Sequence, residues 1–177
     1  MTTIIRLVLI LGFFGAIVSA HQPDVEIATA KMIGASQVAP VFFDPGAKKL
    51  SAEEKSELQV FFTSLRESKE IKSVRVLAWA DREYPAKDEK VSAKQIALAK
   101  ERGEAIRAYL QKDLKIKTVD THNMTERPSK LSEFFKTNDY EVKSSAEATG
   151  AAPTQDKAGV FEEMGRSTTA LVLVVLE

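Results

Sequence analysis

Apolar residues along the chain follow two spacings, one that alternates and one that repeats every three or four positions. Alternating or continuous apolar runs predict strands at residues 37–43, 71–80, 116–124 and 167–177. The helical spacing predicts a helix beginning at Ser51, a second beginning near Ser92 and a short third over 128–135. Because the last strand is a continuous Val/Leu run, we expect it to be buried on both faces.

Short local signals indicate where these elements begin, turn or pack. Pro40 favours an edge position for the first strand, because proline donates no hydrogen bond to a neighbouring strand. Asp-Pro-Gly at 44–46 has the residue order of a tight turn. Ser51, with Glu54 three residues later, predicts a capping box. Gly103 lies inside the second helix at a cost of about 1 kcal/mol relative to Ala, which indicates close packing against the sheet.

The order of these elements predicts an α/β sandwich of the type βαβαβ(α)β, with helices on one face of a small mixed sheet. Right-handed crossovers place the first two helices on the same side of that sheet. Residues 138–160 are poor in apolar side chains, so we expect a flexible insertion there.

The N-terminal residues are predicted not to belong to the fold. Arg6, an uncharged apolar stretch at 7–18 and small residues up to Ala20 follow the order of a cleavable signal peptide. That stretch is shorter than the roughly 20 residues needed to cross a bilayer, so an uncleaved anchor is the less favoured alternative. We therefore expect an exported, periplasmic protein with this division: signal peptide 1–20, N-terminal arm 21–37, one domain 38–177.

Composition limits the classes of partner. Lys plus Arg and Asp plus Glu each total 25, so the formal net charge is +0. No overall field attracts the chain to nucleic acid or to an anionic membrane, and any recognition by charge is expected to be local. The sequence contains no cysteine, which excludes disulfides and thiolate metal sites.

Four segments carry a more specific pattern: "VFFDPGAKKL" (41–50), "VLAWADRE" (76–83), "LAKERGEAIRAYL" (98–110) and "THNMTERP" (121–128). In this order they resemble motifs of the OmpA-like domain, the peptidoglycan-binding module of outer-membrane protein A, peptidoglycan-associated lipoprotein and flagellar stator proteins. Asp81 falls on the aspartate of the family's strand-end motif, and Arg102 falls on the arginine of its helix motif.

The resemblance implies a non-enzymatic protein that holds the diaminopimelate-containing peptide stem of peptidoglycan non-covalently. In that family the aspartate and the arginine grip the free end of diaminopimelate, which carries an ammonium and a carboxylate on one carbon. A carboxylate accepts from the ammonium, and a guanidinium fork takes the carboxylate in two parallel bonds. We therefore expect Asp81 and Arg102 to meet at a strand–helix junction, with the stem held between them.

Three further residues are expected at the same site. Gln95 stands where the family has an asparagine ahead of the helix, and Arg166 is the residue retained from the motif before the last strand. Trp79 shares a face with Leu77 and Asp81 by strand alternation. Its ring either faces the helices as part of the core or lies at the edge of the site, where it would stack on the stem peptide or a sugar; strand alternation favours the edge.

The sequence leaves other interpretations open. Without the resemblance, Asp81 is typical of a turn-capping acid and Arg102 of a solvated helix residue. Ala78, Trp79 and Ala80 depart from the family's Gly-His-Thr, and the loop after Asp81 is longer than the family's. These departures favour an alternative: a degenerate OmpA-like domain that joins periplasmic or outer-membrane proteins without binding the wall.

Catalysis and cofactors are not expected. The sequence has no Gly-rich phosphate loop, no Gly-x-Ser-x-Gly elbow and no Cys–His pair, so we assign no catalytic residue. One metal hypothesis stays open, because cleavage after Ala20 would make His21 the N-terminal residue. Its amine and imidazole, with His122, would then resemble a copper-binding histidine brace.

Overall fold

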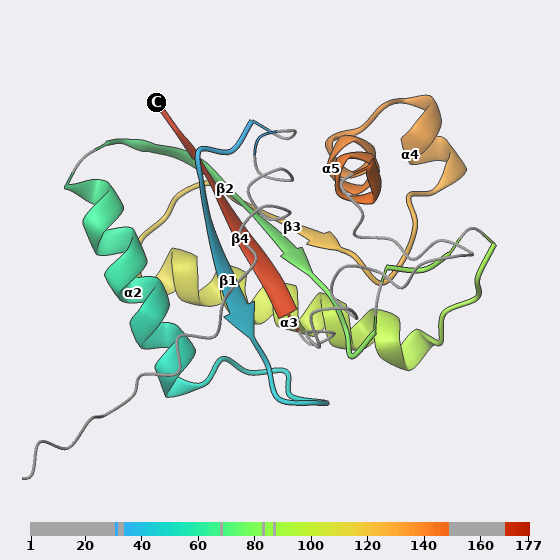
Figure 1. The fold of residues 1–177 in the computed structure, drawn as a ribbon, viewed down its shortest axis with the longest axis horizontal. Coiled ribbons are helices and arrows are strands. Elements are labelled where there is room, and N and C mark those ends of the chain that lie inside the picture. The colour runs from blue at the N-terminus through green and yellow to red at the C-terminus, as the bar shows by residue number, and fades with distance from the viewer. Residues whose placement is uncertain (1–30, 32–33, 68, 83, 87, 149–168) are drawn as a thin grey trace, which may run out of the picture.

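The computed structural model describes residues 31, 34–67, 69–82, 84–86, 88–148 and 169–177 as a small mixed α/β domain built on a four-stranded sheet (Figure 1). The strands are β1 (Gln37–Phe42), β2 (Ile71–Ala78), β3 (Val119–Asn123) and β4 (Thr169–Leu176). The helices are α2 (Ala52–Arg66), α3 (Ala93–Lys112), α4 (Lys130–Phe134) and α5 (Asn138–Ala146). None of these helices combines the length and the apolar character needed to cross a bilayer. The expected signal peptide, most of the expected N-terminal arm, residues 149–160 of the expected insertion and Arg166 lie outside the described residues.

The strands lie in the order β1-β4-β2-β3. β4 runs antiparallel to both of its neighbours, and β3 runs parallel to β2. The central position of β4 explains its continuous apolar run: Leu171 and Leu173 pack on one face, while Val172 and Val174 pack on the other. β1 is an edge strand, as Pro40 predicts.

The two long helices begin at the predicted serines. The Ser51 Oγ accepts a hydrogen bond from the Glu54 amide at 3.1 Å, and the Ser92 Oγ accepts one from the Gln95 amide at 3.4 Å. The Glu54 side chain is buried next to Phe42. Burial raises the pKa of Glu54, against a backbone hydrogen bond from Phe42 that lowers it.

One face of the sheet is covered by α2 and α3, as predicted. Their apolar residues join those of the strands in the larger core cluster, which includes Leu58, Phe62 and Ile106. A Cβ built on Gly103 would lie 3.5 Å from the Cβ atoms of both Ala78 and Thr121. The helix therefore lies close against β2 and β3, as the glycine indicates.

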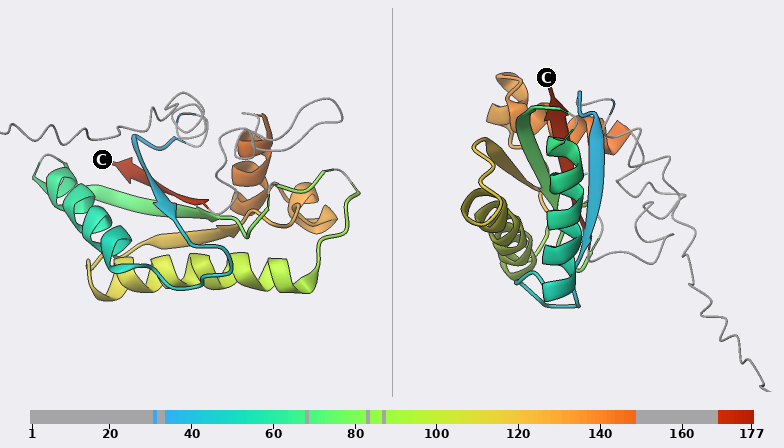
Figure 2. Two further views of the ribbon diagram at one scale, coloured as in Figure 1. Left: turned by 60° about the horizontal axis from the view of Figure 1, so that its bottom comes forward. Right: turned by 90° about the vertical axis from the view of Figure 1, so that its left-hand side faces the viewer.

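The opposite face is covered too, and this corrects the expectation that helices lie on one face only. Helix α5 stands against that face near the ends of β2 and β3 (Figure 2). Val142 and Ala146, one helical turn apart, pack with Leu77 and Leu171 of the sheet. The prediction of a flexible segment from residue 138 is wrong for these residues, because the strands supply the apolar partners that the helix itself lacks.

Candidate ligand-binding site at the end of β2

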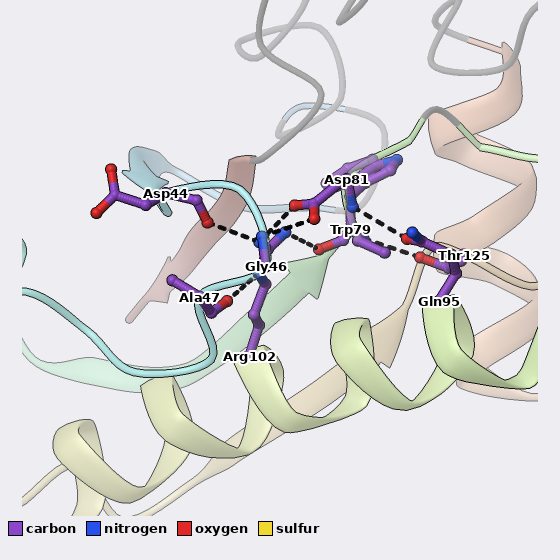
Figure 3. Close-up of polar contacts among 9 residues, drawn as sticks. Asp44, Gly46, Ala47, Trp79, Asp81, Gln95, Arg102 and Thr125 are labelled. Carbon is purple, nitrogen blue, oxygen red and sulfur yellow. Dashed lines mark hydrogen bonds and ion pairs between the residues drawn. The ribbon is translucent and has the colours of Figure 1, made fainter.

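Asp81 and Arg102 meet at the strand–helix junction, as the motifs predict. Asp81 follows β2 closely, and Arg102 lies on the third turn of α3, which passes beneath the strand end (Figure 3). The Arg102 Nη2 lies 2.6 Å from the Asp81 Oδ1, within the range of a charge-assisted hydrogen bond. Packing of α3 against β2 and β3 brings these residues, 21 positions apart, into contact.

The Arg102 guanidinium forms most of its hydrogen bonds with the protein's own backbone. The Arg102 side chain has 0% of its area exposed. Its guanidinium donates to the carbonyl oxygens of Ala47 at 2.8 Å, Trp79 at 3.2 Å and Asp44 at 3.2 Å, and lies 4.9 Å from the Phe43 ring centroid. We expected the Arg102 guanidinium to face a ligand. It instead holds the turn between β1 and α2 against the end of β2.

Asp81 is the partly exposed member of the pair, with 24% of its side-chain area open to solvent. Its Oδ2 accepts a hydrogen bond from the Gly46 amide at 2.7 Å. The turn that presents this amide is closed by the Ala47 amide, which donates to the Asp44 carbonyl at 2.9 Å, with Gly46 at φ 74°. A carboxylate has about four acceptor positions, so Asp81 can take a further donor from outside.

Gln95 and Trp79 support this site in different ways. The Gln95 Oε1 accepts from the Asp81 amide at 3.2 Å, so Gln95 holds the backbone of the aspartate. Trp79 shares the face of Leu77, as predicted, but the residue is 2% exposed and packs in the core beneath α5. The Asp81 carboxylate instead bonds to Arg102 of α3. The buried ring of Trp79 therefore does not stack on a ligand, and the prediction that it lies at the edge of the site is wrong. Trp79 contacts the site through its carbonyl oxygen, which accepts a hydrogen bond from Arg102.

The long loop after Asp81 packs onto the domain. Tyr84 is fully buried, and the Arg127 guanidinium lies 5.2 Å from its ring centroid. Arg127 also donates to the Pro85 carbonyl at 3.0 Å and to both carboxylate oxygens of Glu147 at 2.8 and 3.0 Å. Arg127 thereby joins the loop to the end of α5.

Arg82, the basic residue next to Asp81, is also engaged within the protein. Its guanidinium forms an ion pair with Glu89. The hydrogen bond from Arg82, helped by one from the Ala86 amide, holds the pKa of Glu89 below its ordinary value. Arg82 is therefore not an open replacement for Arg102 as a carboxylate-binding group.

A second polar cluster, which the sequence analysis missed, lies on the α5 side of β3. The His122 Nδ1 lies 3.1 Å from the Asp139 Oδ1, and the Lys143 Nζ lies 3.0 Å from the Asp139 Oδ2. Burial pushes the pKa of Asp139 upward, but the hydrogen bonds from His122 and Lys143 outweigh it and leave that pKa below its ordinary value. The four-residue spacing of Asp139 and Lys143, after the N-cap Thr137, was the available signal.

This cluster borders a pocket of about 310 Å³ between α3, β3 and α5. The His122 Nε2 is buried, and within the described part of the chain it has no hydrogen-bond partner. In that same part no three His, Cys, Asp or Glu side chains gather as metal ligands would. The copper hypothesis depends on His21, which lies outside the described residues.

The site at the end of β2 presents one partly exposed carboxylate, fixed through both oxygens and its own amide. Such a group accepts hydrogen bonds from an ammonium or another cationic N–H donor. No protein-family model matches the chain, and no curated protein shows a significant match to it.

Proposed function

We propose that the chain is a non-enzymatic, exported binding module for the peptide stem of peptidoglycan, with an OmpA-like arrangement of its elements. The observation that carries the proposal is the 2.6 Å pairing of Asp81 with Arg102 at the end of β2, which leaves the Asp81 carboxylate partly exposed. The four motif-like segments around these residues support the same class of ligand.

The two residues have unequal roles in this proposal. Asp81 receives the ammonium of the diaminopimelate tip on the acceptor positions that Arg102 and Gly46 leave open. Arg102 is a positioning residue, because its donors already serve Asp44, Ala47, Trp79 and Asp81. This differs from the symmetrical clasp expected from the sequence, in which the guanidinium would hold the ligand's carboxylate.

A specific observation also favours the alternative, a module for protein interaction without wall binding. Leu131, Phe134 and Phe135, on and next to the short helix α4, have 68%, 79% and 65% of their areas exposed. Large apolar side chains gathered on a surface are typical of sites of protein contact. Together with the complete burial of Arg102, they make a periplasmic or outer-membrane protein partner the second candidate.

Co-sedimentation with purified peptidoglycan sacculi tests the favoured proposal. Asp81→Asn keeps one oxygen, which can accept from Arg102 or from Gly46 but not from both, and it removes the charge that an ammonium needs. We expect it to lower the amount bound about tenfold or more, because a charge-assisted hydrogen bond contributes about 1.5–3 kcal/mol. The matched control is Asp44→Asn, whose carboxylate points away from the Arg102 guanidinium (Figure 3).

Equal sedimentation of wild type, Asp81→Asn and Asp44→Asn would refute wall binding through Asp81. A second measurement covers the case in which Asp81→Asn does not fold. Soluble stem peptide carrying diaminopimelate should then displace the wild-type protein from sacculi, and failure to displace it would count against the proposal equally.

A further inference from the structure

A cleft with a strongly basic wall lies at the end of β2 opposite Asp81. Its volume is about 560 Å³, and it is formed by the last residue of α2, the start of β2, the turn between α3 and β3, and the end of β4. Its charged lining residues are Arg66, Lys69, Lys72, Lys115 and Lys117, with Glu70 and Glu177. Because the whole chain carries 25 charges of each sign, this excess of cations is a local concentration.

Three of these cations come from two stretches of the chain, the start of β2 and the residues before β3, and face solvent. Lys69 precedes β2, Lys72 lies in β2 and Lys117 lies just before β3. All three are exposed, and among the described residues none of their ammonium groups has an ion pair or a hydrogen bond. Like charges brought to one cleft repel one another, and an anion bound between them relieves that repulsion.

The two remaining basic residues of the cleft, Arg66 and Lys115, are held by hydrogen bonds within the protein. The Arg66 guanidinium donates to the Leu114 carbonyl, and the Lys115 Nζ donates to the Lys112 carbonyl at 2.7 Å. Lys115 has φ 58°, a left-handed conformation that glycine usually supplies at a helix end. The backbone conformation and the hydrogen bond to Lys112 fix the place of Lys115, whose ammonium adds positive charge to the cleft.

We propose that this cleft binds a compact anion with more than one negative charge, a phosphate or diphosphate group. Ammonium and guanidinium groups are the usual protein partners of phosphate oxygens. A single carboxylate would leave most of the lysines unmatched, whereas a diphosphate offers an oxygen to each. The acids Glu70 and Glu177 on the wall disfavour an extended polyanion, which would have to pass them.

Titration of the protein with pyrophosphate, followed through backbone amide NMR shifts, tests the proposal. We expect saturable shifts confined to residues 69–72 and 115–118. The variant Lys69→Gln/Lys72→Gln/Lys117→Gln should bind at least about tenfold more weakly, since it removes several charge-assisted bonds. The matched control, Lys90→Gln/Lys94→Gln/Lys130→Gln, has the same net charge and alters exposed lysines outside the cleft.

Control binding equal to wild type, with the cleft variant weakened, supports the site. Equal weakening of both variants, or shifts spread over lysines throughout the surface, would overturn it. The cleft variant should still sediment with sacculi as wild type does, because the cleft lies at the opposite end of β2 from Asp81. Failure of pyrophosphate binding is therefore distinguishable from failure of the proposed wall binding.

Vesicles distinguish the two sources of such a group. Sedimentation with phosphatidic acid vesicles but not phosphatidylcholine vesicles, lost in the cleft variant, identifies the phosphomonoester of a lipid headgroup as the ligand. Pyrophosphate binding without vesicle binding identifies a soluble phosphorylated compound. Absence of both kinds of binding in the wild-type protein would contradict the proposal.

Discussion

The two ends of β2 hold their charges in opposite ways. At the carboxyl end, Arg102 is fully buried and donates to Asp81 and to three backbone carbonyls. At the amino end, Lys69 and Lys72 project into solvent over a cleft, without an internal partner among the described residues. The difference separates cations that hold the fold together from cations that remain available for a ligand.

The largest effect on stability is expected from Asp81→Ala. This change removes the carboxylate that pairs with the buried Arg102 guanidinium. A buried charge left without its partner typically destabilises a protein by about 3–5 kcal/mol. Urea unfolding should show this loss, whereas a loss below about 1 kcal/mol would mean that the pair does not brace the strand end.

A smaller, pH-dependent effect is expected at the same end of the sheet from Asp139→Asn. The folded-state pKa of Asp139 lies below its ordinary value of 3.8. Its contacts with His122 and Lys143 therefore stabilise the fold fully above that ordinary value, and this contribution is lost as the pH falls through the folded-state pKa. At neutral pH we expect a loss of about 1 kcal/mol, because Asp139 is 39% exposed and the asparagine keeps an oxygen that can still accept a hydrogen bond from the buried Lys143.

Denaturant midpoints of wild type and Asp139→Asn at several pH values measure this effect. The gap between the two proteins should be widest near neutral pH and should close as the solution becomes more acidic than the ordinary carboxyl range. A gap that does not change with pH would show that the asparagine acts through packing alone.

The smallest effect on stability is expected at the basic cleft. Replacing Lys69, Lys72 and Lys117 by glutamine should change the free energy of unfolding by no more than about 0.5 kcal/mol, because exposed charges without partners contribute little. Thermal or urea unfolding checks this. A loss comparable with that of Asp81→Ala would contradict the contrast between the two ends.

Much of the fold was predictable because its signals are local. The turn at 44–46, the serine caps of α2 and α3 and the burial of β4 follow from residue types within a few positions of each other. The meeting of Asp81 with Arg102 was predictable for another reason, since the motif order placed one at a strand end and the other on the helix that follows.

Other features depend on distant parts of the chain and could not be predicted. Helix α5 has few apolar residues of its own, and it is covered by Leu77 and Leu171 from strands far away in the sequence. The burial of Arg102 likewise depends on the carbonyls of Asp44 and Ala47, which a motif does not encode. Sequence therefore identified the pair but not which member stays accessible.

The central claim is tested most directly by an NMR titration with a diaminopimelate-containing stem peptide. The comparison is the same peptide acetylated on the free amine of its diaminopimelate. If the Asp81 carboxylate receives the ammonium, the unmodified peptide should shift the amides of Gly46 and Asp81 saturably, and the acetylated peptide should leave them unchanged. Equal binding of both peptides, or shifts that avoid these amides, would contradict the account.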